Sequence, residues 1–162
     1  MDMEKNYSID QILSVDEVRK VHEYLNLIQY DAYWQRRDDL GAVRGINGSQ
    51  CAYDFIGYPS MPHDMKEYLK SLAPRPKGYF LSDMVINRYK PGDFIGSHKD
   101  RAHYRMNTVI ALHESGDGIY FDDEDLFIED KPGQGITLYG TGPVHSVPPV
   151  KNLRHVLIYL YE

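Results

Sequence analysis

Three side chains in the C-terminal half of the chain are of the types that together bind a transition metal. His98 and Asp100 stand two positions apart in the segment His98-Lys-Asp100, and His145 follows downstream. Two imidazoles and one carboxylate form the ligand set that holds mononuclear non-haem iron(II) while leaving coordination positions open. The sequence therefore predicts an iron(II) site with room for further ligands.

The spacing of His98 and Asp100 suits a shared metal, because side chains at positions i and i+2 of an extended segment point the same way. An isolated His-x-Asp pair is common by chance, so the interpretation depends on a third ligand. Its candidates are the histidines that follow the pair: His103, His113, His145 and His155.

His145 is the best of these four candidates. His103 lies in a charged stretch, where a solvated side chain is expected, and His113 ends an apolar strand. His155 lies on the last predicted strand and faces away from its neighbour Arg154. His145 stands between two turn-rich segments, nine residues before Arg154. We therefore predict His98, Asp100 and His145 as the metal ligands.

Arg154 begins the segment Arg-His-Val-Leu-Ile-Tyr-Leu-Tyr, and its strand face also carries Val156, Ile158 and Leu160. A guanidinium that points into an apolar interior is costly unless it is paired. The planar fork of arginine can hold a carboxylate in bidentate fashion, so a bound carboxylate is one partner. An intramolecular salt bridge and a solvent-facing strand start are the alternatives.

Asn87 and Tyr89 share one face of the strand that precedes the metal motif, and a Pro-Gly turn follows them. Their amide and phenol are expected to donate hydrogen bonds to the carboxylates of a co-substrate, although a tyrosine at such a position also serves for packing. The residues expected to contact the substrate directly follow the motif: Arg101, Tyr104 and Arg105.

Two helices and a series of strands must position these residues. A capping box, Ser14-Val-Asp-Glu17, predicts a helix that runs to about Gln29, and a second helix covers 62–72. From Tyr79 onward, segments rich in β-forming residues alternate with Gly- and Pro-containing turns. The predicted strands are 79–89, 106–112, 118–121, 125–129, 135–139, 143–147 and 154–161.

This order of elements predicts an α+β, mainly β fold in which N-terminal helices support a β-barrel or sandwich. A length of 162 residues suits a single domain, with helical support and a loop in 1–78 and the β core in 79–162. Residues 35–50 are polar and glycine-rich, so they are predicted to be a loop. This loop is either a lid over the substrate or a disordered segment.

Composition narrows the class of protein. A net charge of −6 argues against general electrostatic binding to nucleic acid. The single cysteine, Cys51, cannot form a disulfide within the chain, and no hydrophobic run approaches the ~20 residues that span a membrane. The polar N-terminal segment is unlike a signal peptide, so a reducing cytoplasm is the expected location.

Several motifs over 79–162 resemble the 2-oxoglutarate/iron(II) dioxygenase superfamily. They are the pattern Asn-x-Tyr-x-x-Gly-x5-His-x-Asp from Asn87 to Asp100, the segment Gly118-Ile-Tyr-Phe-Asp-Asp, the segment from Pro132 to Tyr139, and His-Ser-Val-Pro-Pro-Val-x3-Arg from His145 to Arg154. The Asn-Tyr pair is similar to the AlkB-like branch, and the last segment is closer to the prolyl 4-hydroxylase-like branch.

The resemblance implies a double-stranded β-helix (jelly-roll) core. It further implies iron(II) held by His98, Asp100 and His145, and 2-oxoglutarate anchored by Arg154 and turned with O2 into succinate and CO2. A carboxylate at position 100 implies hydroxylation, because the related halogenases carry a small residue there.

The substrate interpretation has three versions. Hydroxylation of a peptidyl or small-molecule C–H bond comes first. AlkB-like demethylation of alkylated nucleic acid comes second, because the net charge is negative and the last strand lacks the second arginine expected of that branch. A cupin-like barrel that binds a metal or ligand without turnover is the third.

Overall fold

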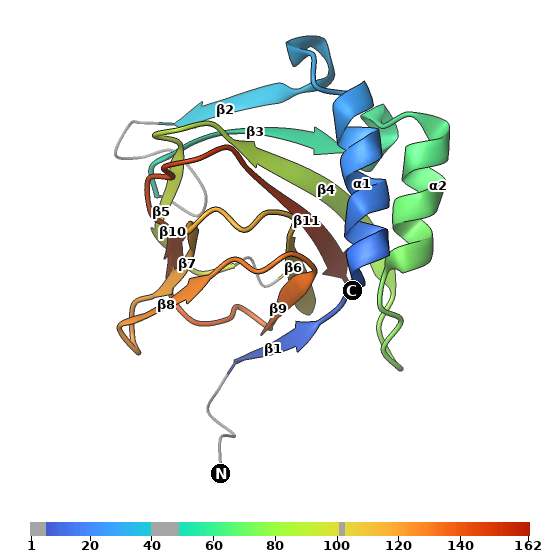
Figure 1. Ribbon diagram of the computed structural model, residues 1–162. Helices are drawn as coiled ribbons and strands as arrows, with labels where there is room; N and C mark the ends of the chain where they lie inside the picture. Colours follow the sequence, from blue (N-terminus) through green and yellow to red (C-terminus); the bar gives the residue numbers. More distant parts are fainter. Residues whose placement is uncertain (1–5, 40–48, 101–102) are drawn as a thin grey trace.

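Eleven strands form one antiparallel sheet that curls into a half-barrel in the computed structural model, which describes residues 6–39, 49–100 and 103–162 (Figure 1). The strands are β1 (Tyr7–Gln11), β2 (Gln35–Asp39), β3 (Cys51–Gly57), β4 (Leu81–Tyr89), β5 (Phe94–His98), β6 (Met106–Ala111), β7 (Gly118–Phe121), β8 (Leu126–Glu129), β9 (Gln134–Tyr139), β10 (His145–Val147) and β11 (Arg154–Tyr161). The α+β, mainly β jelly-roll architecture expected from the sequence is confirmed.

The strand order is β1-β9-β6-β11-β4-β3-β5-β10-β7-β8, and β2 pairs with β3. Strand β11 thus lies between β4 and β6. Its register sets Arg154 opposite Tyr89 and Val156 opposite Asn87. Residues expected to bind a co-substrate therefore meet across two neighbouring strands.

Strand alternation sorts the side chains of β4 and β11 onto two faces. Asn87 and Tyr89 of β4 line the interior cavity, as do Arg154 and Val156 of β11. Residues of the same strands with the opposite alternation point outward into a hydrophobic layer beneath the helices: Met84, Ile86, Leu157, Tyr159 and Tyr161. The same two strands therefore build the cavity wall and the helix-supporting core.

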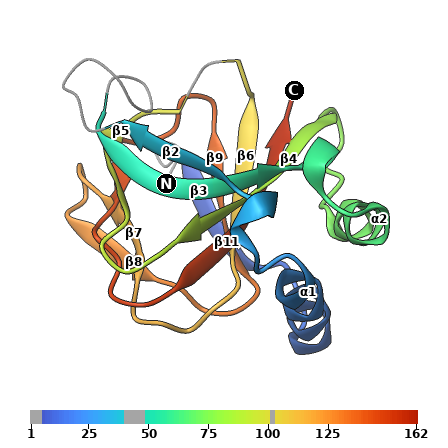
Figure 2. The same cartoon turned by 90° about the horizontal axis from the view of Figure 1, so that it is seen from above.

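Helices α1 (Val15–Leu27) and α2 (His63–Leu72) lie side by side on the outer face of this sheet, beside β4 and β11 (Figures 1 and 2). The predicted capping box is present, because Ser14 Oγ accepts from the Glu17 N–H and the Glu17 carboxylate accepts from the Ser14 N–H. Short 3-10 turns, Asp31–Tyr33 and Tyr58–Ser60, follow α1 and β3. Both helix predictions and their supporting role are confirmed.

Two sequence-based expectations need correction. Residues 35–39 form strand β2 rather than part of a loop, because they pair with β3; residues 40–48 lie outside the described part of the chain. The β core is also not confined to residues 79–162. Strands β1, β2 and β3 come from 1–78 and pair within the same sheet as the C-terminal strands. Strands β1, β3 and β5 were also not predicted.

Neither helix in the described ranges has the length and apolar character needed to cross a bilayer.

Candidate metal centre

The two histidines of the predicted ligand set face each other across a pair of strands. His98 ends β5 and His145 begins β10, and the antiparallel register places them directly opposite one another. Their ring centroids are 4.4 Å apart. Residues that stand opposite each other in a sheet have neighbouring side chains, so the pairing of β5 with β10 builds half of the site.

Backbone carbonyls fix the orientation of both imidazole rings. His98 Nδ1 lies 2.9 Å from the carbonyl oxygen of Gly96, and His145 Nδ1 lies 2.8 Å from that of Pro143. A carbonyl only accepts, so Nδ1 of each ring carries a proton and Nε2 is the nitrogen that faces the cluster. Burial, and then the nearby His145, lower the pKa of His98, which favours the neutral ring that a metal requires.

Asp100 completes the cluster. Its Oδ1 lies 3.5 Å from His145 Nε2 and 3.8 Å from His98 Nε2. One ligand atom from each of the three residues lies within 4.8 Å of the others, and in the described ranges no other group of three metal-binding side chains meets this criterion. Two imidazoles and one carboxylate that converge on one point suit iron(II), so the described residues fit the expected metal.

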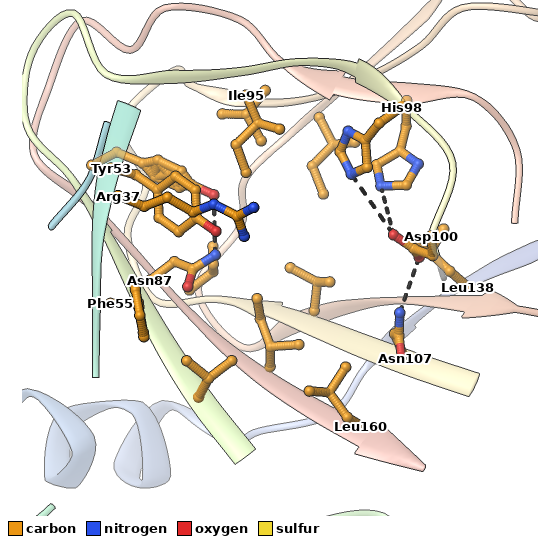
Figure 3. A pocket seen from close by; sticks show the side chains of 18 of the residues that line it. Arg37, Tyr53, Phe55, Asn87, Ile95, His98, Asp100, Asn107, Leu138 and Leu160 are labelled. Atoms are coloured by element: carbon orange, nitrogen blue, oxygen red, sulfur yellow. Dashed lines mark hydrogen bonds and ion pairs between the residues drawn. The ribbon is translucent and has the colours of Figure 1, made fainter. Parts of the chain in front are cut away.

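The three side chains lie at one end of a cavity of about 360 Å3 inside the half-barrel, a volume within the range of small-molecule sites (Figure 3). Asn87 and Tyr53 lie at the opposite end, and apolar side chains such as Ile95 and Leu160 line the cavity between them. The cavity is thus mainly apolar with polar groups at its two ends.

Arg154 lies at the cavity wall with only 1% of its surface exposed. Its Nε and Nη2 donate to the two carboxylate oxygens of Asp130, at 2.7 and 3.2 Å. Burial alone would lower the pKa of Arg154, but the charge of Asp130 raises it, so the guanidinium stays charged. The intramolecular salt bridge that the sequence left as an alternative is therefore present.

The ion pair does not use all of the guanidinium. Among the described residues, Arg154 Nη1 has no hydrogen-bond partner although it is buried. A buried N–H group without a partner is costly, and a ligand oxygen in the cavity would satisfy it. Asp130 thus occupies the Nε–Nη2 edge of the guanidinium, and Nη1 remains available to a further acceptor.

Asn87 and Tyr89 lie beside this arginine. The Asn87 amide donates to the Tyr89 hydroxyl at 3.3 Å, and the Arg154 guanidinium lies 4.9 Å from the centre of the Tyr89 ring. Burial raises the pKa of Tyr89, so its hydroxyl stays protonated and is available as a donor. Asn87, Tyr89 and Arg154 therefore form one polar cluster at the cavity wall.

The residues expected to contact substrate are placed differently. Arg101 lies outside the described part of the chain, and Tyr104 lines the cavity. Arg105 is not among the residues that line the cavity, because its guanidinium stacks over the Tyr79 ring and donates to the carbonyl of Gly78.

Four residues near the site were not found from the sequence. Arg37 of β2 and Tyr53 of β3 line the cavity, Asn107 of β6 donates to Asp100, and Asp130 pairs with Arg154. Asn107 had a usable signal, since it is a polar residue on the same strand face as Val109. Arg37 had none, because its strand lay in a segment that was predicted to be a loop.

Three histidines outside the centre, His22, His113 and His155, form a separate group on the other side of the sheet. His113 Nε2 lies 2.8 Å from His155 Nδ1, and the His113 ring also contacts His22. His155 packs against Trp34. His103 Nε2, in contrast, lies 2.8 Å from a carboxylate oxygen of Glu162 at the surface. None of these rings joins the cluster of His98, Asp100 and His145.

This histidine pair predicts acid sensitivity. Burial, and then neighbouring charges, lower the pKa of His113 to about 4 and that of His155 to about 3, from 6.5 for an ordinary histidine. As the pH falls below 6.5 the unfolded chain binds protons that the folded chain does not, so the free energy of unfolding decreases towards pH 4. Denaturant unfolding at several pH values should show a shallower decrease for His155→Phe than for the wild type. If the free energy of unfolding decreased equally with pH in both proteins, His155 would not be a source of the acid sensitivity.

Comparison with known proteins supports the fold. No known family model matches the sequence, and no curated protein does. Solved structures do match. A prolyl-4-hydroxylase from Pseudomonas putida is 18% identical, with a TM-score of 0.65 over 98% of this chain and 92% of the other.

Two further structures match similarly well. A prolyl hydroxylase from Trichoplax adhaerens, solved with a hypoxia inducible factor peptide fragment, is 17% identical, with a TM-score of 0.66 over 97% of this chain and 83% of the other. The non-haem α-ketoglutarate-dependent epimerase SnoN from nogalamycin biosynthesis is 12% identical, with a TM-score of 0.66 over 98% and 78%. The chain therefore has the fold of the 2-oxoglutarate/iron(II) oxygenases, and the resemblance stated from the sequence is confirmed in the fold.

Proposed function

We propose that this protein is an iron(II)- and 2-oxoglutarate-dependent dioxygenase that hydroxylates a peptidyl or small-molecule C–H bond. One observation carries the proposal: two imidazoles and a carboxylate converge at one end of a cavity that also contains a buried arginine with an unpartnered N–H group. A metal-binding barrel without turnover would not need that arginine inside it.

The described residues have distinct roles in this proposal. His98, Asp100 and His145 hold iron(II) through Nε2, Oδ1 and Nε2. Arg154 Nη1 and the Tyr89 hydroxyl donate to the distal carboxylate of 2-oxoglutarate, and Asn87 orients that hydroxyl. When bound, iron(II), 2-oxoglutarate and O2 supply the oxidation, with release of succinate and CO2. The apolar walls exclude water from the reacting C–H bond.

The substrate class is argued from the structural neighbours and from Asp100. One neighbour with this fold is a prolyl hydroxylase in complex with a peptide fragment, whereas SnoN is an epimerase. We favour hydroxylation because Asp100 supplies the carboxylate ligand. Tyr104 of the cavity lining remains a proposed substrate contact, whereas Arg105 is directed elsewhere.

Anaerobic titration of the protein with iron(II) and then 2-oxoglutarate tests the proposal directly. We expect the weak visible charge-transfer band of a chelated 2-oxo acid to appear in the wild type and to be absent in His98→Ala. Iron binding without the band would contradict the oxygenase assignment and favour the non-catalytic barrel. Appearance of the band would justify a substrate screen that begins with peptides and amino acids.

The role of Arg154 needs a variant that does not leave a lone buried charge. The double variant Arg154→Met/Asp130→Leu removes both members of the ion pair, and such replacements are often neutral for stability. We expect the dissociation constant for 2-oxoglutarate to increase by roughly 10- to 150-fold, since a hydrogen bond to a charged group contributes about 1.5–3 kcal/mol. Iron(II) affinity should not change. An unchanged 2-oxoglutarate affinity in the folded double variant would remove Arg154 from the site.

A further inference from the structure

Asn107 is a buried amide that contacts a predicted metal ligand. It lies on the cavity face of β6, 8% exposed, and its Nδ2 donates to Asp100 Oδ2 at 3.0 Å (Figure 3). The register of β6 places Leu138 on one side of it and Leu160 on the other. An isolated amide between two leucines has no packing role that an apolar side chain would not fill better.

The orientation of this amide has a cost. A carboxylate oxygen only accepts hydrogen bonds, so the NH2 group must face Asp100 and the carbonyl oxygen must face away. In the described ranges, Asn107 Oδ1 is buried without a hydrogen-bond partner. Such an unsatisfied acceptor costs roughly 1–3 kcal/mol. The contact with Asp100 is therefore retained although half of the amide is unsatisfied.

The contact also distinguishes the two oxygens of Asp100. Oδ2 is occupied by the Asn107 amide, whereas Oδ1 faces the histidines, at 3.5 Å from His145 Nε2 and 3.8 Å from His98 Nε2. Carboxylates bind metals through one oxygen or through both. If Asp100 used both, it would fill a coordination position that a bidentate co-substrate or oxygen needs.

We propose that Asn107 is a positioning residue that restricts Asp100 to metal binding through Oδ1 alone, and so keeps a coordination position open. The inference deepens the proposed function, on which the need for open positions rests. The restriction of Asp100 itself follows from the hydrogen bond and applies to any divalent metal in the site.

The test compares Asn107→Leu, which keeps the volume but cannot donate, with Thr108→Val as matched control. Thr108 is the next residue of β6; its buried hydroxyl contacts Thr137 at 3.1 Å and it is not among the residues that line the cavity. Cobalt(II) is the probe, because its visible spectrum reports the number and geometry of its ligands. Thermal melts and circular dichroism establish that each variant is folded.

In Asn107→Leu we expect the cobalt(II) spectrum to change and the cobalt(II) dissociation constant to increase by roughly 10- to 100-fold, as is usual when a residue that orients a ligand is lost. Thr108→Val should match the wild type in both. If the leucine variant does not fold, Asn107→Ala makes the same comparison. A folded position-107 variant with the spectrum and affinity of the wild type would overturn the proposal.

A second measurement separates this inference from the proposed function. In the iron(II) protein, Asn107→Leu should bind 2-oxoglutarate more weakly than Thr108→Val does, since Asp100 is free to take a second position. Failure of the wild type to bind 2-oxoglutarate would contradict the proposed function, while the cobalt(II) comparison would still decide the role of Asn107.

Discussion

Replacement of His145 by alanine is expected to abolish iron(II) binding and all iron-dependent turnover. The variant keeps only one imidazole and one carboxylate of the cluster. His145 stands opposite His98 across β5 and β10, and its Nε2 lies 3.5 Å from Asp100 Oδ1. His113→Ala is the matched control, because its ring belongs to the separate group with His22 and His155. Iron(II) titration and 2-oxoglutarate-dependent succinate production measure both variants.

The two variants together show whether His145 or His113 is the third metal ligand. If His113→Ala lost iron and His145→Ala retained it, the ligand assignment would be wrong. Loss of iron in both variants with unchanged folding would mean that the two histidine groups are coupled, which the absence of His113 from the metal cluster argues against.

Asp130→Ala is expected to decrease the free energy of unfolding by about 3–5 kcal/mol. The substitution leaves the Arg154 guanidinium, 1% exposed, without the carboxylate that holds its Nε and Nη2. An uncompensated buried charge is the reason that removing one member of a buried pair costs so much. Chemical denaturation at neutral pH, monitored by circular dichroism, measures the loss.

The double variant Arg154→Met/Asp130→Leu is the control for this loss, since it removes both charges together. We expect it to unfold with a free energy much closer to that of the wild type than Asp130→Ala does. If Asp130→Ala alone changed the stability by less than about 1 kcal/mol, the charge of Arg154 would have to be compensated by another group.

The sequence predicts the elements that carry strong local patterns. Both helices follow from a capping box and from apolar residues at helical spacing, and the C-terminal strands follow from β-forming residues between turns. Strands β2 and β5 lack such patterns: β2 (QRRDD) is polar, and β5 (FIGSH) contains glycine and serine. They form because a neighbouring strand offers backbone partners, which local propensity does not report.

The residues of the candidate site also fall into those that the sequence predicts and those that it does not. His98 and Asp100 are close in sequence, and His145 and Arg154 follow a recognisable pattern, so these residues could be proposed before the fold was known. The side chains that hydrogen-bond to these residues come from distant segments of the chain. Asp130 reaches Arg154 from the turn before β9, and Asn107 reaches Asp100 from β6. Such partners depend on strand order, and the alternation of β6 is the only local hint of either.

Because side chains alternate along β4 and β11, an odd or even residue number tells which face of the sheet a side chain occupies. In β11 the even-numbered positions from Arg154 to Leu160 face the cavity, and the odd-numbered positions from Leu157 to Tyr161 face the helices. In β4 the parity is reversed, because odd-numbered residues such as Asn87 and Tyr89 line the cavity. Substitutions at one parity therefore act on ligand binding and those at the other on stability. Deletion of a single residue within β11 would exchange the two classes beyond it, so this strand tolerates changes of side chain far better than changes of length.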